Sequence, residues 1–207
     1  MKRGRGPRVG DRRTGPNEPV TGGDWKLDRR GVLPAARQVP SPNCDARPGG
    51  PAIELLVVHS ISLPPGQFAG DGVIEFFTNR LDPSAHPYYR EIAGMQVSSH
   101  FFIRRSGELI QFVACSERAW HAGQSQWRGR SRCNDFSVGV ELEGTDDAPF
   151  TDTQYECLAR LTRALRVAYP IIDCVGHADI AHPPGRKTDP GPHFDWTRFR
   201  AMLESSG

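Results

Sequence analysis

The chain has 207 residues and a formal net charge of +2, with 37% hydrophobic and 24% charged residues. This length suits one domain of ordinary size, and this composition excludes a chain that is disordered throughout. The longest aliphatic run, Leu55 to Val58, is too short for a membrane-spanning helix. The 18 prolines and 22 glycines predict many loops and short regular elements.

Positive charge is concentrated near the N-terminus. Residues 1–24 hold six basic and three acidic side chains, whereas the remaining residues hold 20 basic and 21 acidic ones. A nucleic-acid-binding domain usually carries its positive charge on the folded body, so no nucleic-acid partner is expected. We expect residues 1–24 to form a disordered basic extension and residues 25–207 to form the functional domain. No apolar segment follows the basic residues, so a secretory signal is not expected.

The five cysteines are at least 17 positions apart and include no CxxC pair. An odd number of cysteines without an export signal predicts reduced thiols and a cytoplasmic location. Zinc sites built on cysteine normally use closely spaced pairs, so none is expected here. No heptad pattern indicates assembly, and we therefore expect a monomer.

The first half of the chain predicts a strap, a strand, a short helix and a hairpin, in that order. Residues 31–51 are rich in proline and arginine and are expected to be ordered but irregular. Residues 53–59 are mostly aliphatic and predict a buried strand. Residues 72–80 predict a short helix with Asp71 as its N-cap. Residues 100–113 predict a β-hairpin around a glycine-containing turn.

The second half predicts a strand and a longer helix. Residues 137–143 alternate, which places three apolar side chains on one strand face and Glu141 and Glu143 on the other. Residues 152–169 have apolar residues at helical spacing, a capping box before them and a proline after them. A polar, loop-rich C-terminus is expected to follow. This order predicts a single α/β domain with a central mixed β-sheet flanked by helices.

Three places carry residues suited to metal-assisted hydrolysis. His59 ends an aliphatic strand, Glu141 lies within another, and a segment near the C-terminus supplies His177, Lys187 and Asp189. Two histidines and a carboxylate can hold Zn²⁺ and leave its fourth position open for water. A nearby glutamate can accept a proton from that water, and a lysine can stabilise charge on the attacked carbonyl.

The residue types alone leave other interpretations open. Glu141 and Glu143 could lie on a solvated strand face, and Asp189 before its proline could simply form a turn. The spacing between His177 and Asp189 is weaker evidence for a metal site than an HExxH helix. A structural hydrogen-bonding role is the simplest interpretation of each of the other histidines: His86, His100, His121, His182 and His193.

Seven short blocks stand in order along the chain: Leu56–His59, Ile61–Gly66, Asp82–Tyr88, Ser99–His100, Ala119–Gly123, Cys133–Thr145 and Arg186–Pro192. Together these blocks resemble the zinc N-acetylmuramoyl-L-alanine amidases of the AmpD type, over roughly residues 25 to 200. Each block alone is moderately specific, and the ordered set is highly specific. The resemblance implies a peptidoglycan-recognition-type fold, with a mixed sheet, flanking helices and zinc in a groove.

Carried onto this sequence, the resemblance makes His59, His177 and Asp189 the zinc ligands. It makes Glu141 the proton acceptor and Lys187 the residue that stabilises the transition state. The implied reaction cuts the amide between 1,6-anhydro-N-acetylmuramic acid and L-alanine in a muropeptide. That chemistry belongs to cytosolic peptidoglycan recycling, and in bacteria with an inducible β-lactamase it lowers the level of the inducing muropeptides.

Other residues are candidates for contacts around this site. The peptide arm of a muropeptide carries carboxylates, so Arg132 near Asn134 is a candidate anion clamp. Trp120 could stack on the sugar, and His100 and His121 could surround the metal ligands. A non-catalytic muropeptide-binding module of the same fold is the main alternative, although such a module would be expected to lack a zinc ligand.

The sequence departs from the family pattern in three places. Ser60 stands where asparagine is expected, and Gln96 stands where arginine is expected. The loop from His177 to Lys187 is about two residues longer than usual and contains His182, a rival zinc ligand. A purely structural zinc would need a fourth protein ligand, and only His182 could supply it.

Overall fold

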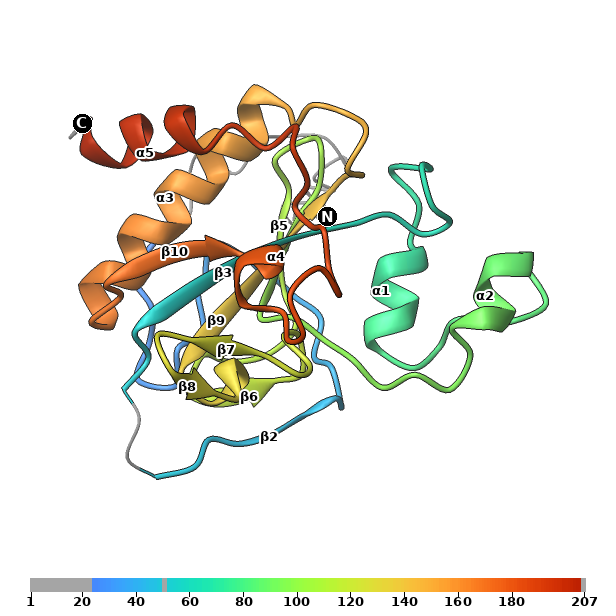
Figure 1. The fold of residues 1–207 in the computed structure, drawn as a ribbon, viewed down its shortest axis with the longest axis horizontal. Helices are drawn as coiled ribbons and strands as arrows, with labels where there is room; N and C mark the ends of the chain where they lie inside the picture. The colour runs from blue at the N-terminus through green and yellow to red at the C-terminus, as the bar shows by residue number, and fades with distance from the viewer. Residues whose placement is uncertain (1–23, 50–51, 206–207) are drawn as a thin grey trace, which may run out of the picture.

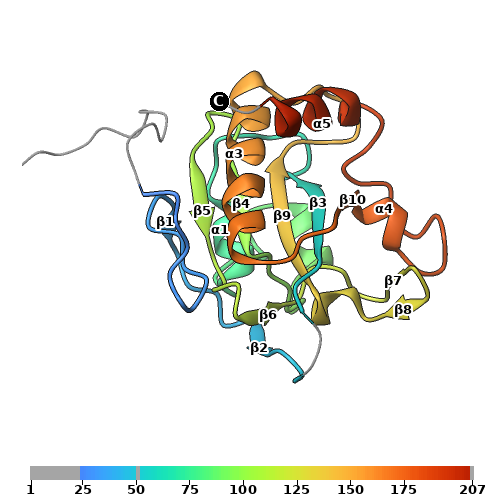
Figure 2. The ribbon, with the colours of Figure 1, turned by 90° about the vertical axis from the view of Figure 1, so that its left-hand side faces the viewer.

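The computed structural model describes residues 24–49 and 52–205. Its centre is a mixed sheet in the order β1-β5-β4-β9-β3-β10 (Figures 1 and 2). Only the β5–β4 pair is antiparallel, and the other neighbours run parallel. The strands are β1 (Arg37–Gln38), β3 (Leu55–Ile61), β4 (Phe101–Ile103), β5 (Leu109–Gln111), β9 (Ser137–Glu143) and β10 (Asp173–Gly176). The expected central mixed sheet is therefore confirmed.

Helices cover both faces of this sheet (Figure 2). The apolar residues Val138, Val140 and Leu142 of β9 pack against α3 and α5, whereas α1 packs on the opposite face. The helices are α1 (Gly72–Phe77), α2 (Pro87–Glu91), the 3-10 helix η1 (Cys133–Asp135), α3 (Asp152–Ala168), α4 (His177–Ile180) and α5 (Trp196–Glu204). No helix among the described residues is long and apolar enough to cross a membrane.

Both expected helices are present. Thr151 and Gln154 form the expected capping box of α3, because each side chain accepts a hydrogen bond from the backbone N–H of the other. Helix α1 is shorter than expected. Asp71 stands at its N-cap position but makes no capping hydrogen bond, since its carboxylate instead accepts from Arg104 at 2.7 Å.

The C-terminus differs from the expected loop. Asp195 caps α5 by accepting from the backbone N–H of Arg198 at 2.9 Å, and Phe199 is fully buried against α3. The sequence signal was present, because Phe199 and Met202 repeat at helical spacing behind a capping aspartate. The short strand β10 was also not anticipated; it pairs with β3 at the edge of the sheet.

The strap before β3 is ordered over its described part, as expected, and it carries two short strands. β1 extends the main sheet, and β2 (Cys44–Ala46) pairs with β6 (Glu117–Ala119) in a separate ribbon. A further hairpin joins β7 (Gln126–Trp127) to β8 (Arg130–Ser131). The expected N-terminal extension, residues 1–24, lies almost wholly outside the described residues.

Candidate metal centre and groove

The candidate metal ligands lie at the carboxyl ends of neighbouring parallel strands. His59 lies near the end of β3, directly opposite Glu141 of β9 in the strand register. His177 is the first residue of α4 and follows β10, which pairs with the other side of β3. Asp189 comes from the loop after α4. Because parallel strands end at the same sheet edge, three distant segments meet there.

Three potential ligand atoms converge at this edge. The Oδ2 atom of Asp189 lies 3.2 Å from Nδ1 of His59 and 3.1 Å from Nδ1 of His177. The ligand atoms of these residues all lie within 4.8 Å of one another. The structure thus brings together the residues that the sequence resemblance implied. It leaves His182 outside this group, on an exposed part of the loop.

The outer ring nitrogens of both histidines are already engaged. Nε2 of His177 lies 3.1 Å from the carbonyl oxygen of Ala122, and Nε2 of His59 lies 2.9 Å from Nδ1 of His121. A carbonyl oxygen can only accept, so Nε2 of His177 donates to it, and the tautomer with its proton there leaves Nδ1 available to a metal ion. Two nitrogen atoms and one carboxylate oxygen are a donor set that fits Zn²⁺. Metal-binding histidines commonly show such outer contacts.

Burial controls the charge state of the groups around this cluster. It lowers the pKa of His59 to about 4, against the opposing effect of Asp189. It also lowers the pKa of His121 well below the ordinary value, and the neighbouring His59 and His100 add to this effect. Burial alone would raise the pKa of Asp189, but its contacts with the two imidazoles lower that pKa overall. Neutral imidazoles beside an ionised carboxylate are the protonation states that metal binding requires.

The structure separates the two glutamates of β9, which the sequence pattern could not distinguish. Both are buried, so neither lies on a solvated strand face. Glu143 accepts hydrogen bonds from the backbone N–H groups of Ala69 at 2.7 Å and Arg105 at 2.9 Å, which ties two loops to the strand.

Glu141 has the opposite character. Its Oε1 atom lies 4.0 Å from Nδ1 of His59, and its buried Oε2 atom has no hydrogen-bond partner among the described residues. Burial, together with the negative charge of Asp189, raises its pKa well above the ordinary value, although Lys187 opposes the shift. A carboxylate with an unused oxygen beside the cluster is available for proton transfer, whereas Glu143 is not.

A groove of about 490 Å³ opens over the cluster. Its polar part includes Glu141, Asp189 and the exposed Lys187. Its apolar residues come from the segment after β3, from α1, from α2 and the loop that follows it, and from the loop after β6. They include Leu63, Phe76, Tyr88, Ile92, Met95, Val97 and Trp120. Such a groove can hold a ligand with one apolar and one polar side.

The expected substrate contacts fall in different places. Trp120 lines the groove, and its Nε1 donates to Asp45 at 3.2 Å. Arg132 and Asn134 are not among the residues that line it. Arg132 forms an ion pair with Asp135 at 3.2 Å.

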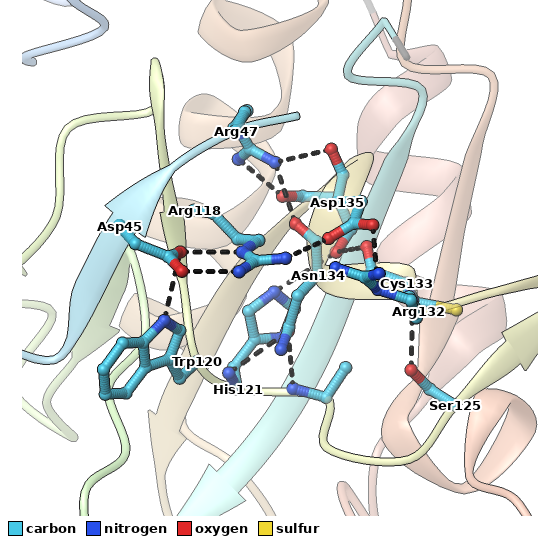
Figure 3. Close-up of polar contacts among 12 residues, drawn as sticks. Asp45, Arg47, Arg118, Trp120, His121, Ser125, Arg132, Cys133, Asn134 and Asp135 are labelled. Carbon is cyan, nitrogen blue, oxygen red and sulfur yellow. Dashed lines mark hydrogen bonds and ion pairs between the residues drawn. The ribbon is translucent and has the colours of Figure 1, made fainter. Parts of the chain in front are cut away.

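Asn134 holds the loop that contains His121 and Ala122, the residues in contact with the outer ring nitrogens of His59 and His177 (Figure 3). Its Oδ1 atom accepts from the backbone N–H groups of His121 at 3.2 Å and Ala122 at 2.8 Å. The position of His121 inside the Ala119–Gly123 block was the one signal in the sequence that pointed to this loop. Its partner, Asn134, lies 13 positions further on, and no local pattern joins the two.

The fold and the site together fit a hydrolase. The cluster of two histidines and one aspartate lies at the edge of a mixed sheet, beside the buried Glu141, whose Oε2 atom has no hydrogen-bond partner among the described residues. Residues 49–192 match a family model described as N-acetylmuramoyl-L-alanine amidase. The chain is 56% identical over 179 residues to the 1,6-anhydro-N-acetylmuramyl-L-alanine amidase AmpD of Escherichia coli (strain K12), covering 86% of this chain and 97% of that protein.

Solved structures agree with this assignment. A crystal structure of a selenomethionine derivative of AmpD matches with a TM-score of 0.82 and 55% identity, over 86% of this chain and 98% of that one. A complex of AmiD from E. coli with anhydro-N-acetylmuramic acid-L-Ala-D-gamma-Glu-L-Lys matches with a TM-score of 0.53 and 29% identity, over 85% and 65% of the two chains. The chain belongs to the N-acetylmuramoyl-L-alanine amidase family and is an enzyme of that class.

Proposed function

We propose that this enzyme hydrolyses the amide between 1,6-anhydro-N-acetylmuramic acid and L-alanine in muropeptides, with Zn²⁺ held by His59, His177 and Asp189. The observation that carries this proposal is the convergence of two Nδ1 atoms and one carboxylate oxygen beside Glu141, whose buried Oε2 atom has no hydrogen-bond partner among the described residues. The identity to AmpD proteins supports the choice of substrate.

Each polar group around the groove has a distinct part in this chemistry. A bound zinc ion would supply Lewis acidity, polarising the lactyl carbonyl and lowering the pKa of water to about 7. Glu141 accepts the proton of the attacking water and passes it to the departing nitrogen of L-alanine. Lys187 places a positive charge on the rim of the groove, where it stabilises charge developing on the carbonyl oxygen. Trp120 and its apolar neighbours contact the sugar and exclude water.

A catalytic role fits the site better than a binding role or a structural zinc. A binding module has no need for a buried carboxylate that lacks a hydrogen-bond donor, because such a group costs free energy in the folded state. A structural zinc site is usually closed by four protein ligands, and the cluster in the described part of the chain has three.

The same proposal places the enzyme in cytoplasmic peptidoglycan recycling, as a monomer acting on a small-molecule substrate. All five cysteines are free thiols, which fits a reducing compartment. In a bacterium with an inducible β-lactamase, the activity would remove inducing muropeptides. The family match over residues 49–192 and the elements found within residues 24–49 and 52–205 support a functional domain at 25–207, with the basic residues 1–24 as an extension.

Mass-spectrometric product analysis tests this proposal. The purified enzyme is incubated with anhydromuramyl tripeptide, with and without a chelator, and then with Zn²⁺ restored. We expect release of a free tripeptide that begins with L-alanine, loss of that release with chelator, and recovery with Zn²⁺. The Asp189→Ala variant should bind no zinc and release no tripeptide. Zinc binding without cleavage would instead favour the binding module, and cleavage elsewhere in the peptide would refute the substrate assignment.

A further inference from the structure

The adjacent residues His121 and Ala122 contact the two histidines of the proposed zinc site, His59 and His177. We propose that His121 is a positioning residue that fixes the tautomer of His59, and that His121 and Ala122 together aim both Nδ1 lone pairs at one point. This inference rests on the proposed zinc ligation by His59 and His177, and it adds a group that holds no metal and touches no reacting atom.

The argument begins at Ser137, where the position of one proton is unambiguous. The Ser137 hydroxyl donates to the carbonyl oxygen of Cys133 at 2.6 Å. A hydroxyl has one hydrogen and a carbonyl oxygen has none, so that proton is used. The Ser137 oxygen also lies 3.2 Å from Nε2 of His121, and toward this atom it can only accept. His121 therefore carries a proton on Nε2.

The next step passes from His121 to His59. With its proton on Nε2, the neutral His121 ring presents a lone pair at Nδ1, which lies 2.9 Å from Nε2 of His59. His59 satisfies that lone pair by donating from Nε2, and its own lone pair is then at Nδ1, the candidate ligand atom of the cluster. A doubly protonated His121 would reverse this order, but it would place a cation in a buried row of histidine rings.

The neighbouring residue, Ala122, acts on His177. The carbonyl oxygen of Ala122 accepts from Nε2 of His177, which leaves Nδ1 free in the second histidine as well. One side-chain oxygen, Oδ1 of Asn134, holds the backbone N–H groups of both His121 and Ala122. Two ligands from separate elements, β3 and α4, are therefore oriented by adjacent residues that share one anchor.

A glycine of the sheet, Gly139 in β9, leaves room for the imidazole ring of His121. A Cβ atom added to Gly139 of β9 would lie 2.5 Å from Cγ of His121, well inside contact distance. Gly139 lies between Ser137 and Glu141 on the same face of β9. Because it has no side chain, the imidazole ring of His121 packs directly against the backbone there. Any larger residue at position 139 would displace the ring from His59.

A pair of amide substitutions at His121 tests the proposal. In His121→Asn the side-chain oxygen can take the place of Nδ1 and accept from His59. In His121→Gln the amide extends instead to the place of Nε2, toward Ser137. Loss of an outer contact to a metal-binding histidine typically weakens metal affinity by about 10–100-fold. We expect a loss of that size for His121→Gln, and a loss of about threefold or less for His121→Asn, in competition titrations against a zinc chelator.

A second measurement depends neither on activity nor on zinc affinity. Nitrogen-15 NMR of the metal-free wild-type protein reports which imidazole nitrogen carries the proton. We expect His59 and His177 in the Nε2–H form, and a gain of the Nδ1–H form at His59 alone in His121→Gln. His100→Asn serves as a matched control in the same buried row, because an asparagine retains an acceptor for the backbone N–H of Gly139; its zinc affinity should equal that of the wild type.

The outcomes separate this inference from the proposed function. Equal zinc affinity in His121→Gln and the wild type, or an Nδ1–H tautomer of His59 in the wild type, would overturn the role of His121. An equal loss of affinity in His100→Asn would show that general softening of the core explains the effect, and would also overturn it. Retention of tightly bound zinc in His59→Ala would instead refute the ligand set of the proposed function.

Discussion

The two glutamates of β9 provide a matched pair of substitutions, because they share a strand face and differ in their contacts. In Glu143→Gln, one oxygen is replaced by an NH2 group, which then faces a backbone N–H donor of either Ala69 or Arg105. In Glu141→Gln, the change affects a carboxylate whose Oε2 atom has no hydrogen-bond partner among the described residues. We expect the first change to reduce stability and the second to reduce turnover.

The contacts of Glu143 set the size of the stability effect. A hydrogen bond to a charged group contributes about 1.5–3 kcal/mol. Glu143→Gln loses one such bond and weakens the other, so the free energy of unfolding should fall by about 3 kcal/mol. In a protein of this size, each kcal/mol shifts the unfolding midpoint by about 2–4 °C, which gives a decrease of about 6–12 °C. Glu141→Gln should leave the midpoint unchanged or raise it slightly, because it removes a buried charge that lacks a donor.

Thermal unfolding of the metal-free proteins and turnover of anhydromuramyl tripeptide by the zinc-loaded proteins measure the two effects separately. Glu141→Gln should lower kcat by about 100-fold or more. Glu143→Gln should retain most of its turnover at a temperature where it is folded. An unchanged midpoint in Glu143→Gln with a collapse of kcat would refute the assignment of roles, as would a large decrease of the midpoint in Glu141→Gln.

Three further results are expected. At a free zinc concentration 100 times the Kd, zinc binding contributes about 2.7 kcal/mol to stability. Removal of zinc by a chelator should therefore lower the unfolding midpoint by about 5–11 °C, and an unchanged midpoint would argue against the metal site. Gly139→Ala should weaken zinc binding in a calorimetric titration although it removes no polar group, because the added Cβ would lie 2.5 Å from Cγ of His121; unchanged affinity would contradict this. Burial raises the pKa of the Cys115 thiol to about 12, so at pH 8 only about one thiol in 10⁴ is ionised, and Cys115 should resist iodoacetamide until the protein unfolds. Rapid labelling of Cys115 in the folded protein, detected by mass spectrometry, would show that this burial is wrong.

Local signals were sufficient for the main strands and for the longest helix. Strand β9 has the expected bounds, because strict alternation over seven residues is hard to produce by chance. Helix α3 ends one residue before its expected end, since a capping box and a following proline mark both termini. The hairpin of β4 and β5 turns at Gly107, which has a φ of 85° that favours glycine.

The features that sequence patterns missed depend on contacts between distant residues. Alternation places Glu141 and Glu143 on one face, but only the positions of Ala69 and Arg105 show which glutamate is structural. The contact between His121 and His59 spans 62 positions and has no local signature. Family resemblance implies the proposed ligand set, whereas the spacing of residues alone leaves it open.

The distance along the chain between His59 and Asp189, 130 positions, has a consequence for biosynthesis. A growing polypeptide exposes His59 early, but Glu141, His177 and Asp189 leave the ribosome much later, and the sheet edge that gathers them forms only when β9 and β10 have joined β3. Zinc bound at this edge would close a very long loop and would hold the C-terminal segments against the strands made first. Metal uptake would then mark the end of folding, so that newly made chains remain inactive toward muropeptides until almost the entire domain has assembled.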